Sequence, residues 1–194
     1  MKLYYSPGAC SLADHIALHE AGMAFEHERV DLKTKQTEHG ADYKAINPKG
    51  YVPALTLDSG ETLTENIAVL DWIADQSATL RPSGPLGRTR QLEALGYVST
   101  EIHKAFAPLF RGGSDEQIDA ARGAVAAKLE MIAGQFRGDW LLGDQPSVAD
   151  FYLFVMLLWA GRQNIPVPAA LEGYRDRLMA RDAVQTAMKH EGLI

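Results

Sequence analysis

Near its start the chain passes from a strand-like segment through a tight turn into a helix, and this order restricts the folds that it can adopt. Leu3 to Tyr5 are apolar, Pro7-Gly8 favours a turn, and a helix is expected to begin near Ser11. Cys10, the single cysteine, therefore falls at a helix N-terminus, where unpaired N–H groups and the helix dipole favour a thiolate or a bound anionic sulfur. The alternative is a small buried cysteine that packs in the turn, and this stretch alone does not decide between the two.

The composition argues against several classes of function. A net charge of −6 is unusual for proteins that bind nucleic acid or acidic membranes, which are generally basic. One cysteine allows neither an intrachain disulfide nor a cysteine-based zinc cluster, and it fits a reducing compartment. The most apolar stretch, 148–161, contains Asp150 and is too short to span a bilayer, and no basic-then-apolar leader follows Met1. We therefore expect a cytoplasmic protein without a nucleic-acid or membrane partner.

Alternating signals in the first part of the chain predict a mixed α/β unit. Apolar and charged residues alternate from Phe25 to Leu32, as in a half-exposed strand. Two further strands, Val52 to Leu57 and Thr62 to Thr64, flank a tight turn, and a helix opens at Glu65-Asn66. The polar stretch from Lys33 to Tyr43 is predicted to be a loop with at most a short helix. The predicted order is βαβ, loop, ββα.

The Val52-Pro53 pair limits how the third strand begins. Proline cannot donate to a sheet ladder, so Pro53 belongs at the first residue of a strand or on an edge. A cis peptide bond before it would leave the backbone of Val52 exposed to pair with an extended ligand. Because only about 5–6% of X-Pro bonds are cis, the sequence alone makes this the minority outcome.

The second part of the chain is predicted to be helical throughout. Residues 77–86 are rich in Ser, Pro and Gly and form the best linker candidate, which predicts domains at 1–76 and 87–194. Helical periodicity covers 87–110, 115–136 and 148–162, with shorter helices at about 171–180 and 182–189. Pro108 is expected to bend or end the first of these helices. The segment 148–162 is apolar on nearly all sides and should be the buried central helix.

Two polar patterns are interpreted as structural. Ser147 to Asp150 resembles a capping box with Asp in place of the usual Glu or Gln, so Asp150 is expected to start a helix rather than act as an acid or base. His15 and His19 have the i,i+4 spacing of a metal site beside Glu20. No third ligand follows at matching spacing, and we expect a solvated helix face and no metal.

These signals and five local motifs resemble the glutathione S-transferase family, and the bacterial beta class in particular, which carries a cysteine where other classes have tyrosine or serine. The resemblance covers essentially the full length, through the motifs at Lys2–Leu12, Asn47–Leu55, Leu63–Asn66, Glu101–Phe110 and Leu142–Asp150. It implies an α/β thioredoxin-like N-terminal domain (βαβ-ββα) that binds glutathione, followed by an all-α C-terminal domain that shapes the electrophile site. It also implies a cytoplasmic homodimer that serves in detoxification.

The resemblance also implies a role for particular residues. Cys10 would face the glutathione sulfur, and Val52 would pair its backbone with the cysteinyl part of the ligand through a cis-Pro53 turn. The residues assigned to glutathione are Tyr5, Cys10, Lys35, Val52, Pro53, Glu65, Asn66 and His103, and those assigned to catalysis are Cys10, Ser11, His103 and Lys104. In this scheme His103 and Lys104 approach the sulfur from the second domain.

The chemistry of the ligand is consistent with the N-terminal assignments. Glutathione carries a carboxylate at each end, so Lys35 can meet the glycyl carboxylate, although a solvated loop lysine is the alternative. Glu65 can meet the γ-glutamyl amino group, and the N–H groups of the helix that begins there can meet the neighbouring carboxylate. Plain helix capping is the alternative for Glu65 and Asn66. Family members more often carry Ser or Gly at the position of Asn66, which places a direct side-chain contact there in question.

His103 flanks the core stripe of its predicted helix, so it can face a cleft or be structural. The His103-Lys104 pair ahead of an apolar run favours function, because a cation there would lower the pKa of a nearby thiol. Gly96 departs from the family pattern, in which Asn is frequent, so any bond made by that side chain is missing.

Three hypotheses follow for the activity. The leading one is a glutathione transferase, in which hydrogen bonds from Ser11 or backbone N–H groups and positive potential stabilise the thiolate of glutathione, which then attacks a hydrophobic electrophile. The second is a glutathione-dependent thiol transferase, peroxidase or reductive dehalogenase that works through a Cys10–glutathione mixed disulfide, with a second glutathione as resolving thiol. The third is a non-enzymatic binding protein of the same fold.

Overall fold

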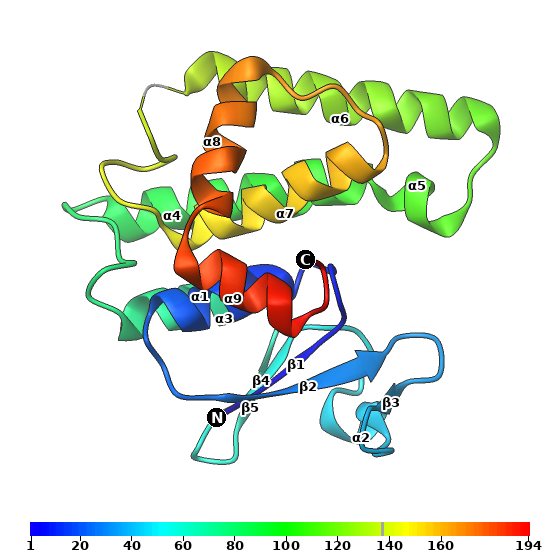
Figure 1. Ribbon diagram of the computed structural model, residues 1–194, viewed down its shortest axis with the longest axis vertical. Coiled ribbons are helices and arrows are strands. Elements are labelled where there is room, and N and C mark those ends of the chain that lie inside the picture. Colours follow the sequence, from blue (N-terminus) through cyan, green and yellow to red (C-terminus); the bar gives the residue numbers. More distant parts are fainter. Residues whose placement is uncertain (137) are drawn as a thin grey trace. The chain divides into compact units, whose positions relative to one another are not determined.

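The computed structural model describes residues 1–136 and 138–194, and its contacts divide the chain into two compact units. The first unit consists of Met1–Arg81 together with Ala180–Ile194, and the second is Pro82–Met179 (Figure 1). The sequence assigned residues 180–194 to the helical domain, whereas the contacts group them with the strands. The cause is visible in Figure 1, where helix α9 (Asp182–His190) packs alongside α1 (Leu12–Glu20) and buries Val184, Ala187 and Met188.

The first unit is built on a five-stranded mixed sheet of order β3-β2-β1-β4-β5. Its strands are β1 (Lys2–Tyr5), β2 (Glu26–Asp31), β3 (Gln36–Thr37), β4 (Ala54–Thr56) and β5 (Thr62–Thr64). β1 pairs in parallel with β2, with Leu3 opposite His27, and antiparallel with β4, with Leu3 opposite Leu55. The parallel pair requires a crossover, which α1 supplies. This is the predicted thioredoxin-like βαβ-ββα arrangement, completed by α3 (Asn66–Gln76).

One predicted loop carries regular structure. Within 33–43 the two-residue strand β3 pairs with the end of β2, with Val30 opposite Thr37, and the short helix α2 (Tyr43–Ile46) begins at the end of this stretch. Asp42 precedes α2 and its carboxylate accepts a hydrogen bond from the N–H of Lys44. The strand was missed because only one of its two residues is buried, so no alternating pattern exists to detect.

The second unit is helical, as predicted, but its first helix is interrupted. Its helices are α4 (Gly87–Tyr97), the π-helical segment η1 (Val98–His103), α5 (Ala107–Arg111), α6 (Asp115–Gln135), α7 (Val148–Arg162) and α8 (Ala169–Met179). The predicted helix 87–110 is therefore three segments. Pro108 lies in the first turn of α5, where its missing N–H costs nothing, so it starts a helix rather than ending one.

Helix α7 forms the core of the second unit, and nearly all of its side chains are buried. Asp150, itself fully buried, accepts hydrogen bonds from the N–H and hydroxyl of Ser147 (both 2.7 Å), the N–H of Leu141 (2.8 Å) and the hydroxyl of Tyr174 (2.9 Å). The expected structural role of Asp150 is confirmed. Among the described residues, no helix has both the length and the apolar character needed to cross a membrane.

We predict that Asp150→Asn lowers the free energy of unfolding by about 2–4 kcal/mol, because an amide NH₂ would face donors that now meet a carboxylate oxygen. Guanidinium denaturation followed by circular dichroism measures the loss. Asp144→Asn, in the exposed part of the same loop, is the matched control and should stay within about 0.5 kcal/mol of the parent. Equal losses in the two variants would contradict the role assigned to Asp150.

Candidate active site

The turn between β1 and α1 places Cys10 at the start of a helix. Backbone bonds run from the N–H of Leu12 to the carbonyl of Ala9 and from the N–H of Ala13 to that of Cys10 (both 3.0 Å), so a hydrogen-bonded turn that contains the cysteine leads directly into α1 at Leu12. The hydroxyl of Ser11 accepts from the N–H of Ser6 (3.2 Å), which closes the turn. The helix N-terminus predicted at Cys10 is confirmed.

The thiol of Cys10 lies against the Val52-Pro53 segment. Its Sγ–H donates to the carbonyl oxygen of Val52 at 3.6 Å, and the Val52-Pro53 peptide bond is cis, the outcome that the sequence made a minority one. Burial raises the pKa of the Cys10 thiol to about 12, with a further contribution from the charge of Asp14. Loss of solvation therefore outweighs the backbone N–H groups at Cys10, so of the two alternatives at this helix end the free protein favours a site for a bound anionic sulfur over a Cys10 thiolate.

Asp14 lies one helical turn beyond Cys10 and was not predicted. It is fully buried, and neither carboxyl oxygen has a hydrogen-bonding partner among the described residues. Burial raises its pKa well above the ordinary value, with the charge of Glu191 adding to the effect. Only its i,i+4 spacing from the cysteine could have drawn attention to it.

A second group of polar side chains lies at the N-terminus of α3. Glu65 precedes the helix at φ +73°, and its carboxylate binds the ammonium of Lys49 and the hydroxyl of Tyr51 (2.7 Å for the latter) instead of capping the helix. These two bonds lower the pKa of Glu65, so it is a carboxylate at neutral pH. Sequence reasoning missed Lys49 and Tyr51, although both belong to the Asn47–Leu55 motif.

Asn66, the next residue, has the opposite character. Its side chain is 8% exposed, and its amide oxygen and nitrogen are both buried without a hydrogen-bonding partner among the described residues. Burying an amide without a hydrogen-bonding partner costs free energy, and a helix-capping bond would avoid this cost, but the Asn66 side chain makes none. Asn66 thus retains hydrogen-bonding capacity for a bound molecule at the N-terminus of α3.

Lys35 and Tyr5 have contacts within the unit. The ammonium of Lys35 donates to the carbonyl of Gly50 at 2.7 Å, which places this cation beside the 47–53 segment that also carries Val52. Tyr5 is buried, its ring packs against His15 and His27, and its hydroxyl donates to the carbonyl of His190 at 3.4 Å. The Tyr5 hydroxyl therefore serves the packing of this unit.

His103 and Lys104 belong to the second unit. His103 ends η1, its Nδ1 is 2.6 Å from the Tyr152 hydroxyl, and its ring meets Trp159 edge to face. Burial lowers the pKa of His103, so its imidazole is neutral at pH 7 and exposed Lys104 is the cation of the pair. Their approach to the sulfur stays a prediction.

An aromatic surface continues from His103 along the same unit. The ring of Phe110 stacks on Phe106 and meets Trp159 edge to face, with ring centroids 5.8 and 4.8 Å apart. Phe110 is 51% exposed, so this group offers an apolar contact surface. A Cβ built at Gly96, two residues before η1, would meet no described atom within 4 Å, so the departure from Asn leaves open space.

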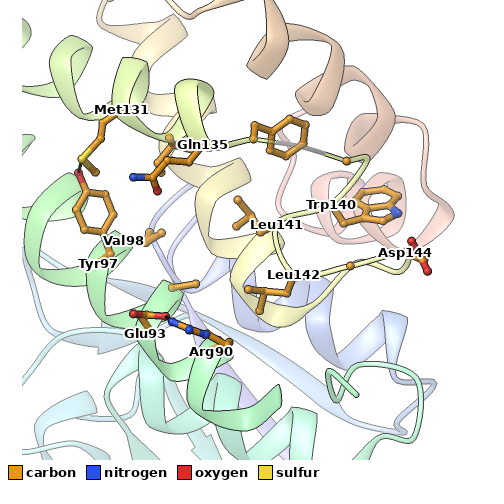
Figure 2. A pocket seen from close by; sticks show the side chains of 15 residues that line it. Arg90, Glu93, Tyr97, Val98, Met131, Gln135, Trp140, Leu141, Leu142 and Asp144 are labelled. Atoms are coloured by element: carbon orange, nitrogen blue, oxygen red, sulfur yellow. Dashed lines mark hydrogen bonds and ion pairs between the residues drawn. The ribbon is translucent and has the colours of Figure 1, made fainter. Parts of the chain in front are cut away.

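A cavity of about 740 Å³ also lies in the second unit, between α4, α6 and the 138–144 loop. Figure 2 shows Tyr97 and Met131 on one side and Leu141, Leu142 and Trp140 on the other, with Arg90 and Glu93 at the edge. None of the predicted site residues lines it. The cavity lacks the chemistry assigned to the reaction, and we place the site elsewhere.

The burial and the surroundings of His15 and His19 differ from the expectation of a solvated helix face. His15 is fully buried and only His19 is partly exposed, so the predicted solvated helix face is wrong. Further imidazoles reach the pair from β2 and from the end of α9. Those partners are remote in sequence, and therefore no local spacing rule could find them.

We predict that Cys10 of the free protein is alkylated by iodoacetamide at a rate that keeps rising through pH 10, because its thiolate forms only near the pKa of about 12. Asp14→Asn removes a neighbouring negative charge and should raise the rate at pH 9 about three- to tenfold. Asp58→Asn, which removes an exposed charge from the same unit, should leave the rate unchanged. A plateau below pH 9 in the parent would contradict the assignment.

Comparison with known proteins agrees with this geometry. Family models for the glutathione S-transferase N-terminal domain and C-terminal domain match residues 9–76 and 97–182. Glutathione S-transferase GstA of Escherichia coli O157:H7 is 40% identical, with 100% of both chains covered. A sphingomonad glutathione S-transferase complexed with glutathione is 49% identical at a TM-score of 0.94, and the bacterial beta class enzyme of Sphingomonas chungbukensis is 47% identical at 0.92, each with 100% of both chains covered. The chain belongs to the glutathione S-transferase family.

Proposed function

We propose that this protein conjugates the thiolate of glutathione to small hydrophobic electrophiles. The observation that carries the proposal is the Cys10 thiol held against the carbonyl of Val52 at a cis Val52-Pro53 bond, beside the α1 N-terminus. An extended peptide that pairs with the backbone of Val52 would bring its own sulfur to this helix end. The similar sphingomonad enzyme, whose structure holds glutathione, supports the same ligand here.

We assign the γ-glutamyl end and the glycyl end of glutathione to polar side chains of the first unit. Glu65 is a carboxylate at neutral pH and can bind the γ-glutamyl amino group. The unpartnered amide of Asn66 and the N–H groups that open α3 can bind the adjacent carboxylate, which favours a direct Asn66 contact despite its departure from the family pattern. Lys35 can meet the glycyl carboxylate with the donors that its bond to Gly50 leaves available.

In the proposed reaction, the N-terminus of α1 stabilises the sulfur anion of glutathione rather than a thiolate of Cys10. Glutathione gives up its thiol proton to solvent, and the N–H groups at the start of α1 stabilise the sulfur anion. The fully buried Ser11 hydroxyl closes the turn that positions these N–H groups. For an aromatic halide, the sulfur forms a bond to the ring carbon, and the carbon–halogen bond breaks with the halide carrying its electron pair away. We assign the electrophile to the exposed ring of Phe110, which packs on the buried rings of Phe106 and Trp159 near His103 and Lys104.

The proposal also covers the cellular compartment of the enzyme, its oligomeric state and its co-substrate. We place it in the cytoplasm, where its one thiol stays reduced, and expect it to act as a homodimer like other members of its family. Glutathione is the co-substrate, and the conjugation step itself requires no metal. The redox alternative requires a nucleophilic Cys10, which the raised pKa of this thiol opposes.

The role of Glu65 gives a binding prediction. Glu65→Gln should raise the KM for glutathione about tenfold to hundredfold, because a charged partner of the amino group is lost. Glu61→Gln, a change of the same kind in the exposed turn between β4 and β5, is the control and should leave KM unchanged. Steady-state kinetics and retention on immobilised glutathione measure both. Equal KM values for the two variants would remove Glu65 from the site.

The role of Cys10 gives a second prediction that separates the alternatives. Conjugation of 1-chloro-2,4-dinitrobenzene at millimolar glutathione should be measurable, and Cys10→Ala should lower kcat/KM less than about tenfold, because a neutral thiol is a weak donor. Ser11→Ala should lower kcat more than Cys10→Ala does.

Two outcomes would favour the other hypotheses. Conjugation that is absent while oxidised glutathione forms an adduct at Cys10, seen by mass spectrometry, indicates the redox chemistry. Retention on immobilised glutathione with neither reaction indicates a binding protein.

A further inference from the structure

Four of the six histidines gather in the first unit, outside the glutathione site. His15 and His19 lie on α1, His27 on β2, and His190 is the last residue of α9. The packing of α9 on α1 and the parallel pairing of β1 with β2 bring them together. The ring of His15 lies 5.1 to 5.5 Å from those of the other three, measured between centroids.

The imidazole nitrogens converge at distances that suit a metal ion. His15 Nε2 is 3.4 Å and His19 Nε2 is 3.3 Å from His190 Nδ1. One nitrogen each from His15, His27 and His190 lie within 4.8 Å of one another. Tetrahedral zinc binds imidazole nitrogen at about 2.0–2.1 Å, which sets its ligand atoms about 3.3–3.4 Å apart. Two of the observed separations match that value, and small rotamer changes would bring in His27.

Hydrogen bonding alone does not satisfy this cluster. His190 Nδ1 faces two Nε2 atoms, and a neutral imidazole nitrogen carries at most one hydrogen. His27 Nδ1 is buried without a hydrogen-bonding partner among the described residues. A metal ion would instead accept the lone pairs that are left over.

The buried carboxylate of Glu191 prepares His15 for such a role. Its Oε1 accepts the Nδ1–H of His15 at 3.0 Å, and both side chains are fully buried. This bond fixes the tautomer and directs the Nε2 lone pair of His15 into the cluster. Carboxylate–histidine pairs of this kind support the ligands of metal sites in general.

The histidine cluster is accessible to an ion from the surface of the unit. His190 is exposed and His15 is buried, so the cluster runs from the surface to the interior and gives an ion a way in. Burial lowers the pKa of His15 to about 2 and that of His19 to about 4, with the neighbouring imidazoles adding to the effect. The rings of Phe25 and Tyr5 flank them.

We propose that His15, His27 and His190 bind one divalent first-row transition-metal ion of the zinc type, with His19 placed to supply a fourth imidazole. Neutral imidazole ligands suit zinc, copper and nickel rather than magnesium or calcium. The site is independent of the conjugation chemistry, because none of these four residues is assigned to the electrophile or to the glutathione sulfur.

The experiment uses the full chain without an affinity tag, titrated with zinc chloride at pH 7.5 by calorimetry. We expect one zinc ion per chain for the parent and binding about 100-fold weaker or lost for His190→Ala, which removes an exposed ligand. His39→Ala, which removes an exposed histidine outside the cluster, should bind as the parent does. His27→Ala, checked for folding by circular dichroism, should match His190→Ala.

Cobalt substitution adds a readout of the ligand type. We expect visible absorption typical of tetrahedral cobalt without the near-ultraviolet band of a thiolate ligand, because Cys10 takes no part. Zinc affinity that is equal in the parent, His190→Ala and His39→Ala, a thiolate band, or no binding by the parent would each overturn the proposal. Conjugation activity of His190→Ala equal to that of the parent would show that the two sites are separate.

Discussion

The buried carboxylate of Glu191 ties together the turn, the helix and the C-terminal segment on which the first unit depends. One oxygen accepts the N–H of Gly8 at 2.8 Å and the other accepts the Nδ1–H of His15 at 3.0 Å. Gly8 has φ +68°, a conformation that favours glycine, and it lies two residues before Cys10. Removing the carboxylate would take away the acceptor of these two hydrogen bonds, and a buried donor that loses its acceptor costs about 1–3 kcal/mol. The C-terminal residues therefore belong physically with the β1–α1 turn.

That turn shows how solvation decides the role of a cysteine. A helix N-terminus stabilises a negative charge by about 0.3–1 kcal/mol. The rise in the Cys10 pKa from 9.0 to about 12 corresponds to a few kcal/mol in the opposite direction. Burial has a larger effect on the Cys10 pKa than the helix N-terminus has, so Cys10 is a neutral thiol in the free protein. A bound sulfur that is less enclosed than Cys10 can use the same N–H groups without that cost, which is why we propose that the thiolate belongs to the ligand.

The sequence predicted the fold well because the fold depends on local periodicity. The alternation at Phe25 to Leu32 became β2, and the apolar run 148–162 became α7 with the same bounds. The interruption of the predicted helix 87–110 was missed, because a π-helical segment such as η1 preserves the helical pattern of apolar residues.

Contacts between distant segments account for the other differences. Glu65 looked like a helix cap, yet its partners Lys49 and Tyr51 come from the loop before β4. His15 and His19 looked like an exposed pair, yet α9 and β2 cover them with His190 and His27. Only the packed chain shows which polar groups meet, so the position of a site can be predicted from motifs more readily than its electrostatics.

Unpartnered buried polar atoms recur at the places assigned to ligands, but they do not mark a site by themselves. Asp14 and Gln91 each bury such atoms among the described residues, and no group around them indicates a ligand. At Asn66 the N–H groups that open α3 add a second observation, and at His27 three further imidazoles do so. Each atom costs the free protein about 1–3 kcal/mol. A bound molecule that satisfies it recovers that cost as affinity, so Asn66 adds support to the glutathione proposal and His27 to the metal proposal.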